Sequence, residues 1–438
     1  MAATFADALK VDDVRKRLGW NFLGLAVFVL TIHISMPGVN KDVWNALLAR
    51  GELFQFLGMF TGGALNNFSV AAMGITPYIN ASIIMQLLTV VIPQLKDLQK
   101  EGGDIGRRKI GQYTRTLTLI LATLQAVFMT LSLARYSASS TTGGVFTMSG
   151  IGFYVMVILA MVSGTMFLMW LGGLLTERGI GNGVSLLIFA GIVLRFPNYL
   201  QDTFAKAGVQ GATYVMSLII FFIIMILLVA AIVMIHLGQR KVPVQYPKRQ
   251  VGRKVYGGHS TYIPIRVNNA GVLSIIFAIS IMYLPNTFAQ FLVEPAQKHP
   301  WLLSTLQFIN SVFDPRTWFY NLMYAGLVIF FTYFYSAITF NIQDVADNMK
   351  KYGGFIPGIR PGRPTAEYLD RVLSRITLVS ALFLAFIAVA PTFIMQLTGV
   401  NTFFLGSTSL LIIVGVALDT MQQIEARLVM RHYQGFMK

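Results

Sequence analysis

Ten stretches of the 438-residue sequence are long and apolar enough to cross a membrane as helices. A bilayer core of about 30 Å requires about 20 residues of helix. Few other sequence features restrict a fold as strongly, because every backbone amide inside lipid must be satisfied within the protein. We therefore predict an all-α integral membrane protein with ten transmembrane helices and no soluble domain of any size. The predicted spans lie near 18–36, 76–93, 116–134, 151–173, 183–196, 212–236, 270–289, 320–340, 376–394 and 401–418.

The first apolar stretch follows a basic segment, as it would in a secretory signal peptide. It lacks a small-residue cleavage site and nine further spans follow it, so we expect a retained helix. The chain is 55% hydrophobic with a mean hydropathy of +0.64. Soluble domains contain only about 45–50% apolar residues, which again favours a membrane protein.

The basic residues are distributed unevenly between the two sides of the predicted spans. With the N-terminus placed in the cytoplasm, 25 of the 34 lysines and arginines fall on cytoplasmic segments and seven on the opposite side. The positive-inside rule then places both termini in the cytoplasm. The net charge of +16 is thus explained by membrane orientation, without a need for nucleic-acid binding.

The interior of the predicted spans contains no acidic or basic side chains. A charge at the bilayer centre costs at least about 2.5 kcal/mol, so transporters that couple to ions or protons keep such residues for a function. Their absence disfavours a secondary transporter of a small solute, although that remains the alternative because transporters also contain broken helices. His33 and His236 lie in or at the end of spans, and we interpret both as packing residues.

The sequence offers no recognisable catalytic or cofactor site. It contains no cysteine, no HExxH motif and no phosphate-binding GxxxxGK[ST] motif. The hydroxyl cluster of Ser407, Thr408 and Ser409 has no histidine or carboxylate beside it in its own span, and small hydroxyls in membrane helices usually serve close packing. We expect no enzymatic activity, no metal and no cofactor, so energy from ATP or GTP must come from a partner.

The segment at 54–74 is moderately apolar but too short and too rich in glycine and asparagine to span a bilayer. We interpret it as a re-entrant or half-length helix, after which a new helix starts at Thr76 and Pro77. Irregular backbone at membrane depth requires burial by protein or access to water, so the segment predicts a water-filled cavity near 54–80. An extracellular surface helix that never re-enters the membrane is the alternative.

Two predicted cytoplasmic loops, at 237–269 and 341–371, are longer than a helix connection requires. The first carries β-prone stretches with Pro243 and Pro264 at positions suited to sheet edges, which predicts a hairpin. The second presents Arg360 between prolines that restrict the backbone. Both loops could contact anionic lipid headgroups. Their length and charge favour a docking platform for an acidic partner or for RNA phosphates.

Several motifs along the chain together resemble the SecY family, whose members form the pore of the bacterial Sec protein translocation channel. The resemblance extends from about Arg15 to about Glu425. The motifs lie at 62–65 (GGAL), 77–93 (PYINASIIMQLLTVVIP), 106–115 (GRRKIGQYTR), 176–185 (TERGIGNGVS), 248–256 (KRQVGRKVY) and 355–362 (FIPGIRPG).

This resemblance implies an hourglass pore between two pseudo-symmetric five-helix halves, at 1–211 and 212–438. Its implied function is to translocate unfolded preproteins and to release membrane segments sideways into a bacterial plasma membrane. The implied partners are a ribosome bound through rRNA phosphates or a SecA ATPase, SecE-like and SecG-like small subunits, and signal sequences. A membrane scaffold without conductance is a third hypothesis.

The resemblance also assigns roles to individual residues of this chain. The constriction falls on Ile75, Ile79, Val184, Ile188, Ile276 and Ile412, where valine at 184 replaces an isoleucine common in the family. A ring of apolar side chains dewets and blocks ions, yet can part around a polypeptide. The plug falls on about 60–72, with Phe60, Gly62, Gly63, Asn66 and Asn67. The lateral gate falls near Asn80 and Leu284, and partner binding falls on Arg253, Lys254, Arg360 and Arg363.

Overall fold

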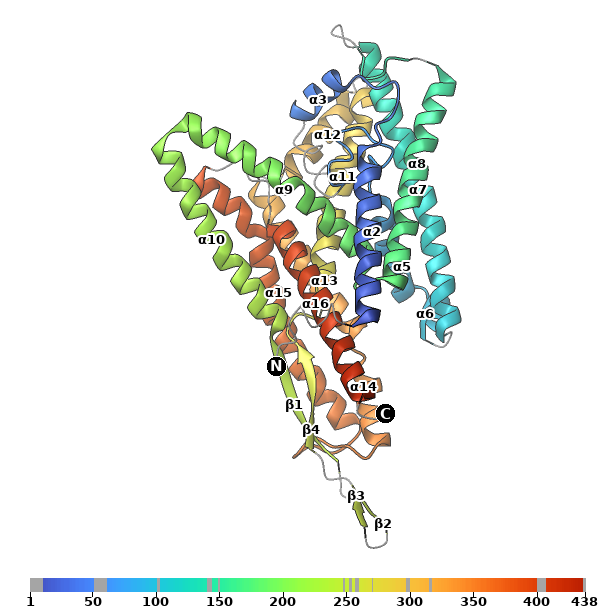
Figure 1. Ribbon diagram of the computed structural model, residues 1–438, viewed down its shortest axis with the longest axis vertical. Coiled ribbons are helices and arrows are strands. Elements are labelled where there is room, and N and C mark those ends of the chain that lie inside the picture. The colour runs from blue at the N-terminus through green and yellow to red at the C-terminus, as the bar shows by residue number, and fades with distance from the viewer. Residues whose placement is uncertain are drawn as a thin grey trace.

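A computed structural model shows a bundle of long helices with a slender projection at one end (Figure 1). It describes residues 11–50, 61–100, 103–139, 144–148, 150–246, 249–251, 254–256, 260–269, 271–296, 300–314, 317–399 and 407–435. Strands β1–β4 form the projection, and we call this the strand-bearing end. The opposite end carries two short helices, α3 and α12, which Figure 1 shows far from the strands. They comprise Lys41–Arg50 and Pro300–Val312.

The described part of the first half of the chain is mainly helical. In chain order the remaining helices of this half are α2 (Asp12–His33), α5 (Thr76–Val91), α6 (Pro93–Lys100), α7 (Gly103–Ser139), α8 (Ile151–Arg178) and α9 (Gly183–Gln210). The second half contains α10 (Ala212–Leu237), α11 (Leu273–Ala296), α13 (Trp318–Thr339), α14 (Ile342–Lys351), α15 (Arg363–Thr398) and α16 (Ser407–Gly435).

Each of the ten predicted spans overlaps one of these helices. Within the described residues, seven helices are individually long and apolar enough to cross a bilayer, and α5 with α6 makes an eighth that is bent by 103°. Among the described residues of α11, the stretch Leu273–Met282 is a shorter apolar helix. The chain is an all-α integral membrane protein, as predicted, although these criteria alone do not reach ten spans.

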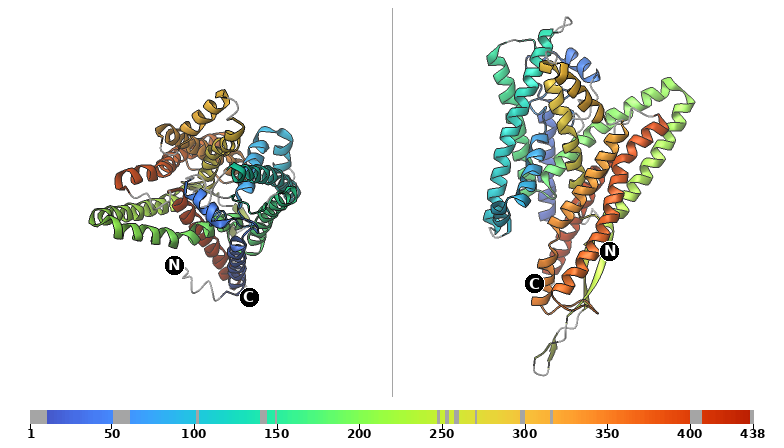
Figure 2. Two further views of the ribbon diagram at one scale, coloured as in Figure 1. Left: turned by 90° about the horizontal axis from the view of Figure 1, so that it is seen from above. Right: turned by 180° about the vertical axis from the view of Figure 1, so that it is seen from behind.

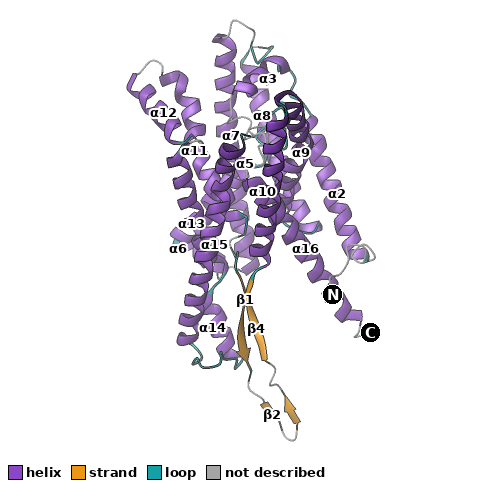
Figure 3. Cartoon of the chain, turned by 90° about the vertical axis from the view of Figure 1, so that its left-hand side faces the viewer, coloured by secondary structure: helices purple, strands orange, loops and turns teal. Residues whose placement is uncertain are grey.

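The two long loops fold into one unit at the strand-bearing end (Figure 3). Strand β1 (Gln239–Gln245) pairs antiparallel with β4 (Ser260–Arg266), and β2 (Arg249–Val251) pairs with β3 (Lys254–Tyr256) at the tip. The predicted hairpin is therefore present. Each of these sheets has two strands, so both β1 and β4 are edge strands, and they accommodate Pro243 and Pro264 in this way.

The second loop joins this hairpin through backbone hydrogen bonds and a shared apolar core. Gln245 and Phe355 exchange two such bonds, at 2.9 and 3.0 Å. The apolar faces of the strands pack on α14 and the first turns of α15, so the two loops share a small hydrophobic core. The shared core comprises Val242, Val244, Ile265, Met349, Ile356, Leu369 and Leu373. We call this folded part the docking unit.

Candidate functional site

The predicted constriction residues come together near the middle of the bundle. Five of them are buried and belong to one continuous hydrophobic cluster, although they come from four helices and the turn before α5. These are Ile75, Ile79, Ile188, Ile276 and Ile412, which we call the waist isoleucines. Val184, one turn before Ile188 on α9, is half-buried against this cluster. Its Cγ2 lies 3.2 Å from the position of a Cβ at Gly172 of α8.

A cavity of about 370 Å³ lies on the side of the waist that faces the strands. Three waist isoleucines, Ile188, Ile276 and Ile412, contribute to its lining. Polar side chains make up much of the remaining wall: Asn182, Ser185, His236, Arg266, Asn268, Asn269, Thr339 and Asp419. An apolar constriction therefore borders a polar cavity. The other two waist isoleucines, Ile75 and Ile79, are absent from this lining, although they belong to the same cluster.

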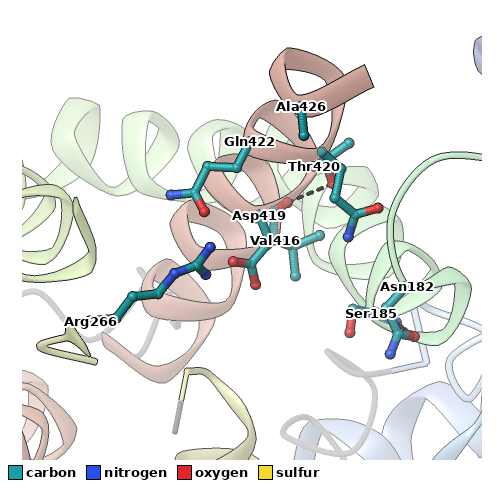
Figure 4. A pocket seen from close by; sticks show the side chains of 9 residues that line it. Asn182, Ser185, Arg266, Val416, Asp419, Thr420, Gln422 and Ala426 are labelled. Carbon is teal, nitrogen blue, oxygen red and sulfur yellow. Dashed lines mark hydrogen bonds between the residues drawn. The ribbon is translucent and has the colours of Figure 1, made fainter. Parts of the chain in front are cut away.

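A second cavity of about 280 Å³ adjoins the first along α16 (Figure 4). The two share Asn182, Ser185, Arg266, Val416 and Asp419 in their linings, and α16 contributes Thr420, Gln422 and Gln423 to the second. Asn182 is fixed in position because its side chain caps α9, accepting hydrogen bonds from the backbone of Val184 and Ser185. The polar wall is thus built partly from a helix cap.

His236 and Asp419 form a polar link that the sequence did not reveal. The Nε2 of His236 lies 3.2 Å from Oδ1 of Asp419, which connects the end of α10 to α16. The imidazole is buried and the carboxylate is about half exposed to the cavity. This geometry agrees with the interpretation of His236 as a packing residue. Asp419 was missed because it lies one residue beyond the last predicted span.

The predicted plug is a series of turns in its described part. The expected half-length helix is not found at residues 61–75, and Phe60 lies outside the described residues. Backbone φ angles are +66° at Gly62, +90° at Gly63, +42° at Phe68 and +58° at Gly74. A right-handed helix cannot continue through left-handed positions, and a non-glycine residue there is strained. We call residues 61–75 the turn segment.

The turn segment is buried inside the bundle. Only Asn66, Asn67 and Val70 are partly exposed, and the remaining residues are buried. The indole Nε1 of Trp44 donates a hydrogen bond of 2.8 Å to the carbonyl of Leu65. The alternative of a surface helix outside the membrane does not fit these residues, because a surface helix would expose one face.

Glycines allow the neighbouring helices to approach the turn segment closely. A Cβ at Gly62 would lie 2.9 Å from both the Cα of Gly191 on α9 and the Cδ1 of Ile32 on α2. A Cβ at Gly164 of α8 would lie 2.1 Å from the carbonyl oxygen of Val70. The segment is therefore seated between α2, α8 and α9 at distances that no larger residue permits.

Gly164→Ala is expected to unseat the turn segment, because the added methyl group overlaps the Val70 carbonyl. Overpacking of this kind costs about 1–3 kcal/mol. We expect a lower melting temperature and a resting ion conductance raised at least about threefold in planar bilayers. Gly173→Ala on the same helix is the control, because nothing lies within 4 Å of its Cβ. Equal conductance in the two variants would argue against a sealing role.

The two predicted lateral-gate residues lie on helices that contact one another, α5 and α11. Asn80 is half-buried, and its Oδ1 is buried without a hydrogen-bond partner among the described residues. Leu284 is in the helical part of α11, but its side chain lies outside the described residues. The structure therefore places the two helices together and does not describe a contact between these side chains.

The predicted partner-binding residues lie on the docking unit. Arg360 is exposed, and its guanidinium has no hydrogen-bond or ion-pair partner in the part of the chain that the structure describes. Its carbonyl accepts a 2.8 Å hydrogen bond from the Thr365 hydroxyl, which fixes the backbone. Arg363 is also exposed and lies 3.3 Å from Glu367. Lys254 begins β3, its side chain is not described, and Arg253 lies outside the described residues.

Comparisons with known proteins identify relatives over the whole chain. A family model described as SecY matches residues 69–421. The "Protein translocase subunit SecY" of Thermotoga maritima is 42% identical over 100% of this chain and 98% of its own length. That of Streptomyces lividans is 45% identical over 100% of both chains.

Solved structures resemble this fold at lower sequence identity. A structure titled as that of a protein conducting channel has a TM-score of 0.64 at 18% identity, covering 95% of this chain and 93% of its own. Sec61 from the canine ribosome-channel complex has a TM-score of 0.60 at 17% identity, with coverage of 95% and 93%. At these identities the likeness establishes the fold.

Proposed function

Because this chain belongs to the SecY family, we propose that it is a protein-conducting channel, which translocates unfolded preproteins across a membrane and releases membrane segments sideways into it. The observation that carries this proposal is the apolar waist between a polar cavity and the buried turn segment. A folded protein would not fit through such a waist, whereas an unfolded polypeptide of varied sequence can part it.

The waist isoleucines would seal the resting channel without a specific ligand. A narrow apolar constriction dewets, which raises the barrier to ions. The turn segment would act as a plug on the opposite side of the waist from the polar cavity. Together they would exclude ions when no polypeptide is present, and both would have to move when one enters.

The two halves, at 1–211 and 212–438, would move relative to one another around this pore. Lateral release would occur between α5 and α11, which carry Asn80 and Leu284. Both helices contribute waist isoleucines. A movement that separates them would therefore widen the waist and open a side exit at the same time.

The docking unit would receive the partner that supplies energy. We propose a SecA-type ATPase or a ribosome bound through rRNA phosphates, together with SecE-like and SecG-like small subunits. Anionic lipids would contact the remaining basic residues. The protein would have no catalytic activity of its own. It would reside in a bacterial plasma membrane with both termini in the cytoplasm. This orientation is supported by the basic residues on the predicted cytoplasmic segments, which include the two long loops at the strand-bearing end.

Binding of a ribosome or an acidic motor to the docking unit is expected to weaken as salt is added. Charge pairing releases counterions, so affinity should fall at least about tenfold between about 50 and about 200 mM salt. Co-sedimentation of labelled membranes with ribosomes measures this. A salt-independent affinity would indicate apolar docking instead.

Transport by the purified protein tests the proposed function directly. The chain would be reconstituted in vesicles with candidate small subunits, a motor and a labelled preprotein, and protection of the preprotein from protease would be measured. Uptake of small solutes in the absence of preprotein transport would favour a secondary transporter. Absence of both activities, and of conductance after deletion of the turn segment, would favour a scaffold.

A further inference from the structure

The two cavities beside the waist lie where the two halves of the chain meet. Figure 2 shows α7 and α8 of the first half on the opposite side of the bundle from α10 and α15 of the second half. Asn182 and Ser185 line both cavities from the first half, and α16 and the end of β4 line both from the second. A polypeptide entering from the strand-bearing end would therefore pass these walls before it reaches the waist.

The walls of these cavities carry one basic and one acidic side chain. Among the described residues that line either cavity, Arg266 is the sole lysine or arginine and Asp419 is the sole acidic residue. Both residues line both cavities. Arg266 ends β4 and is exposed, and the side chain of Asp419 on α16 is 48% exposed. We call Arg266 and Asp419 the wall charges.

The wall charges point into the cavity and each can take a further partner. Figure 4 shows the Arg266 side chain reaching toward Asp419. The guanidinium of Arg266 has no hydrogen-bond or ion-pair partner in the part of the chain that the structure describes. Asp419 contacts His236 through Oδ1 at 3.2 Å, and its Oδ2 has no partner among the same residues. The buried imidazole thus holds the carboxylate in place while one oxygen stays available to the cavity.

The wall charges lie close enough to the waist to act on a charge inside it. Asp419 follows waist isoleucine Ile412 by seven residues on α16, which is about 10 Å along the helix axis. An extended polypeptide covers this distance with about three residues. Arg266 lines the same cavity as Ile412 and Ile276. Because water leaves an apolar constriction, a charge about 10 Å away is screened less there than in bulk water.

We propose that the wall charges determine how fast charged segments of a polypeptide pass the waist, with Asp419 favouring basic segments and Arg266 favouring acidic ones. This inference rests on the proposed function. A charged side chain loses water as it enters the waist, which costs free energy. The wall charge of opposite sign offsets part of this cost, and the wall charge of like sign adds to it. With both present, neither kind of segment is strongly disfavoured.

Asp419→Asn and Arg266→Gln each remove one wall charge and keep a polar side chain. Each variant would be reconstituted with a motor and candidate small subunits, and three preproteins would be compared that differ only in a stretch of lysine, glutamate or glutamine. All rates would be measured at one pH, so that the charge of His236 stays constant. An ionophore would remove the membrane potential, which itself acts on charged segments.

The measured quantity is the transport rate of the lysine preprotein divided by that of the glutamate preprotein. We expect this ratio to fall about three- to tenfold in Asp419→Asn and to rise about as much in Arg266→Gln. A structural defect would slow both preproteins and leave the ratio unchanged. Opposite shifts in the two variants therefore report on charge.

Two variants with the same changes of charge are the matched controls. Glu425→Gln lies six residues further along α16, and Arg240→Gln lies on β1, which pairs with β4. Both residues are exposed and neither lines either cavity. The ratio should stay close to the wild-type value in both controls. The double variant of Asp419→Asn with Arg266→Gln should return the ratio toward the wild-type value, because the two effects are opposite in sign.

The glutamine preprotein separates the role of the wall charges from the proposed function. If the protein is a translocation channel, the wild type should transport this preprotein whatever the outcome for charged segments. Absence of that transport in the wild type would contradict the proposed function. Normal transport with unshifted ratios, shifts in the same direction for both single variants, or equal shifts in the controls would overturn the proposed role of the wall charges alone.

Discussion

Arg360→Glu is expected to reduce preprotein transport at least about tenfold while the protein still inserts into the membrane. Arg360 is exposed on the docking unit, and its guanidinium has no partner among the described residues. Prolines at 357 and 361 and left-handed glycines at 358 (φ +81°) and 362 (φ +98°) shape the turn around it. Little ordering is therefore needed to present a bidentate donor to a carboxylate or phosphate.

Reversing this charge would replace attraction by repulsion at the contact. Loss of one partner of a close charge pair at an interface costs about 2–5 kcal/mol, which corresponds to more than about tenfold in affinity. Motor binding and preprotein transport would be measured on the same vesicles. Both should fall together, because the substitution acts on docking and leaves the pore unchanged.

Two control substitutions separate a specific contact from general charge. Lys351→Glu makes the same change of charge at an exposed position at the end of α14, and it should reduce transport far less. Arg360→Lys keeps the charge but loses the bidentate geometry, so an intermediate effect is expected. Normal transport by Arg360→Glu would rule out the docking role.

The helical spans could be predicted from the sequence because membrane insertion depends on local composition. Length and apolarity place a helix wherever about 20 apolar residues occur, whatever the rest of the chain does. The hairpin was predictable for the same reason, from local β propensity and proline positions. The chain's helix cap at Asn182 also follows a local rule.

Contacts between distant segments could not be predicted in this way. Residues 245 and 355 lie far apart in the sequence, yet their backbone pairing joins the two loops into the docking unit. The pairing of His236 with Asp419 spans a longer stretch, with a sequence separation of 183. Nothing in the local sequence of either partner identifies the other, so these contacts can be identified only from the three-dimensional structure.

In the turn segment, apolar composition did not correctly predict the backbone conformation. Glycine and asparagine correctly indicated irregular backbone, but a half-length helix was expected from its apolar composition. The left-handed conformation of Phe68 carries no sequence signal, since such residues rarely adopt it. Its ring is held edge-on to Trp44 at a centroid distance of 4.9 Å. Tertiary packing therefore imposes a conformation that local preference opposes.

Replacing Ile79, Ile188 and Ile276 together by serine is expected to raise the resting ion conductance at least about tenfold. These residues come from three helices and belong to one buried cluster, and two of them line the polar cavity. An apolar constriction excludes ions because water leaves it. Hydroxyl groups at the same positions would retain water, so the barrier to ions should fall. Single-channel recordings in planar bilayers would measure this without any polypeptide present.

A triple variant one helical turn away distinguishes the seal from simple loss of packing. Ile83, Ile192 and Ile279 lie on the same three helices, are equally buried, and follow the waist isoleucines by three or four residues. Serine at these positions removes similar apolar burial and should lower the melting temperature to a similar extent. It should leave the conductance close to that of the wild type, because the waist itself is intact. Equal leakage through both triple variants would mean that ions pass through a loosened bundle, and the waist isoleucines would then have no special role in the seal.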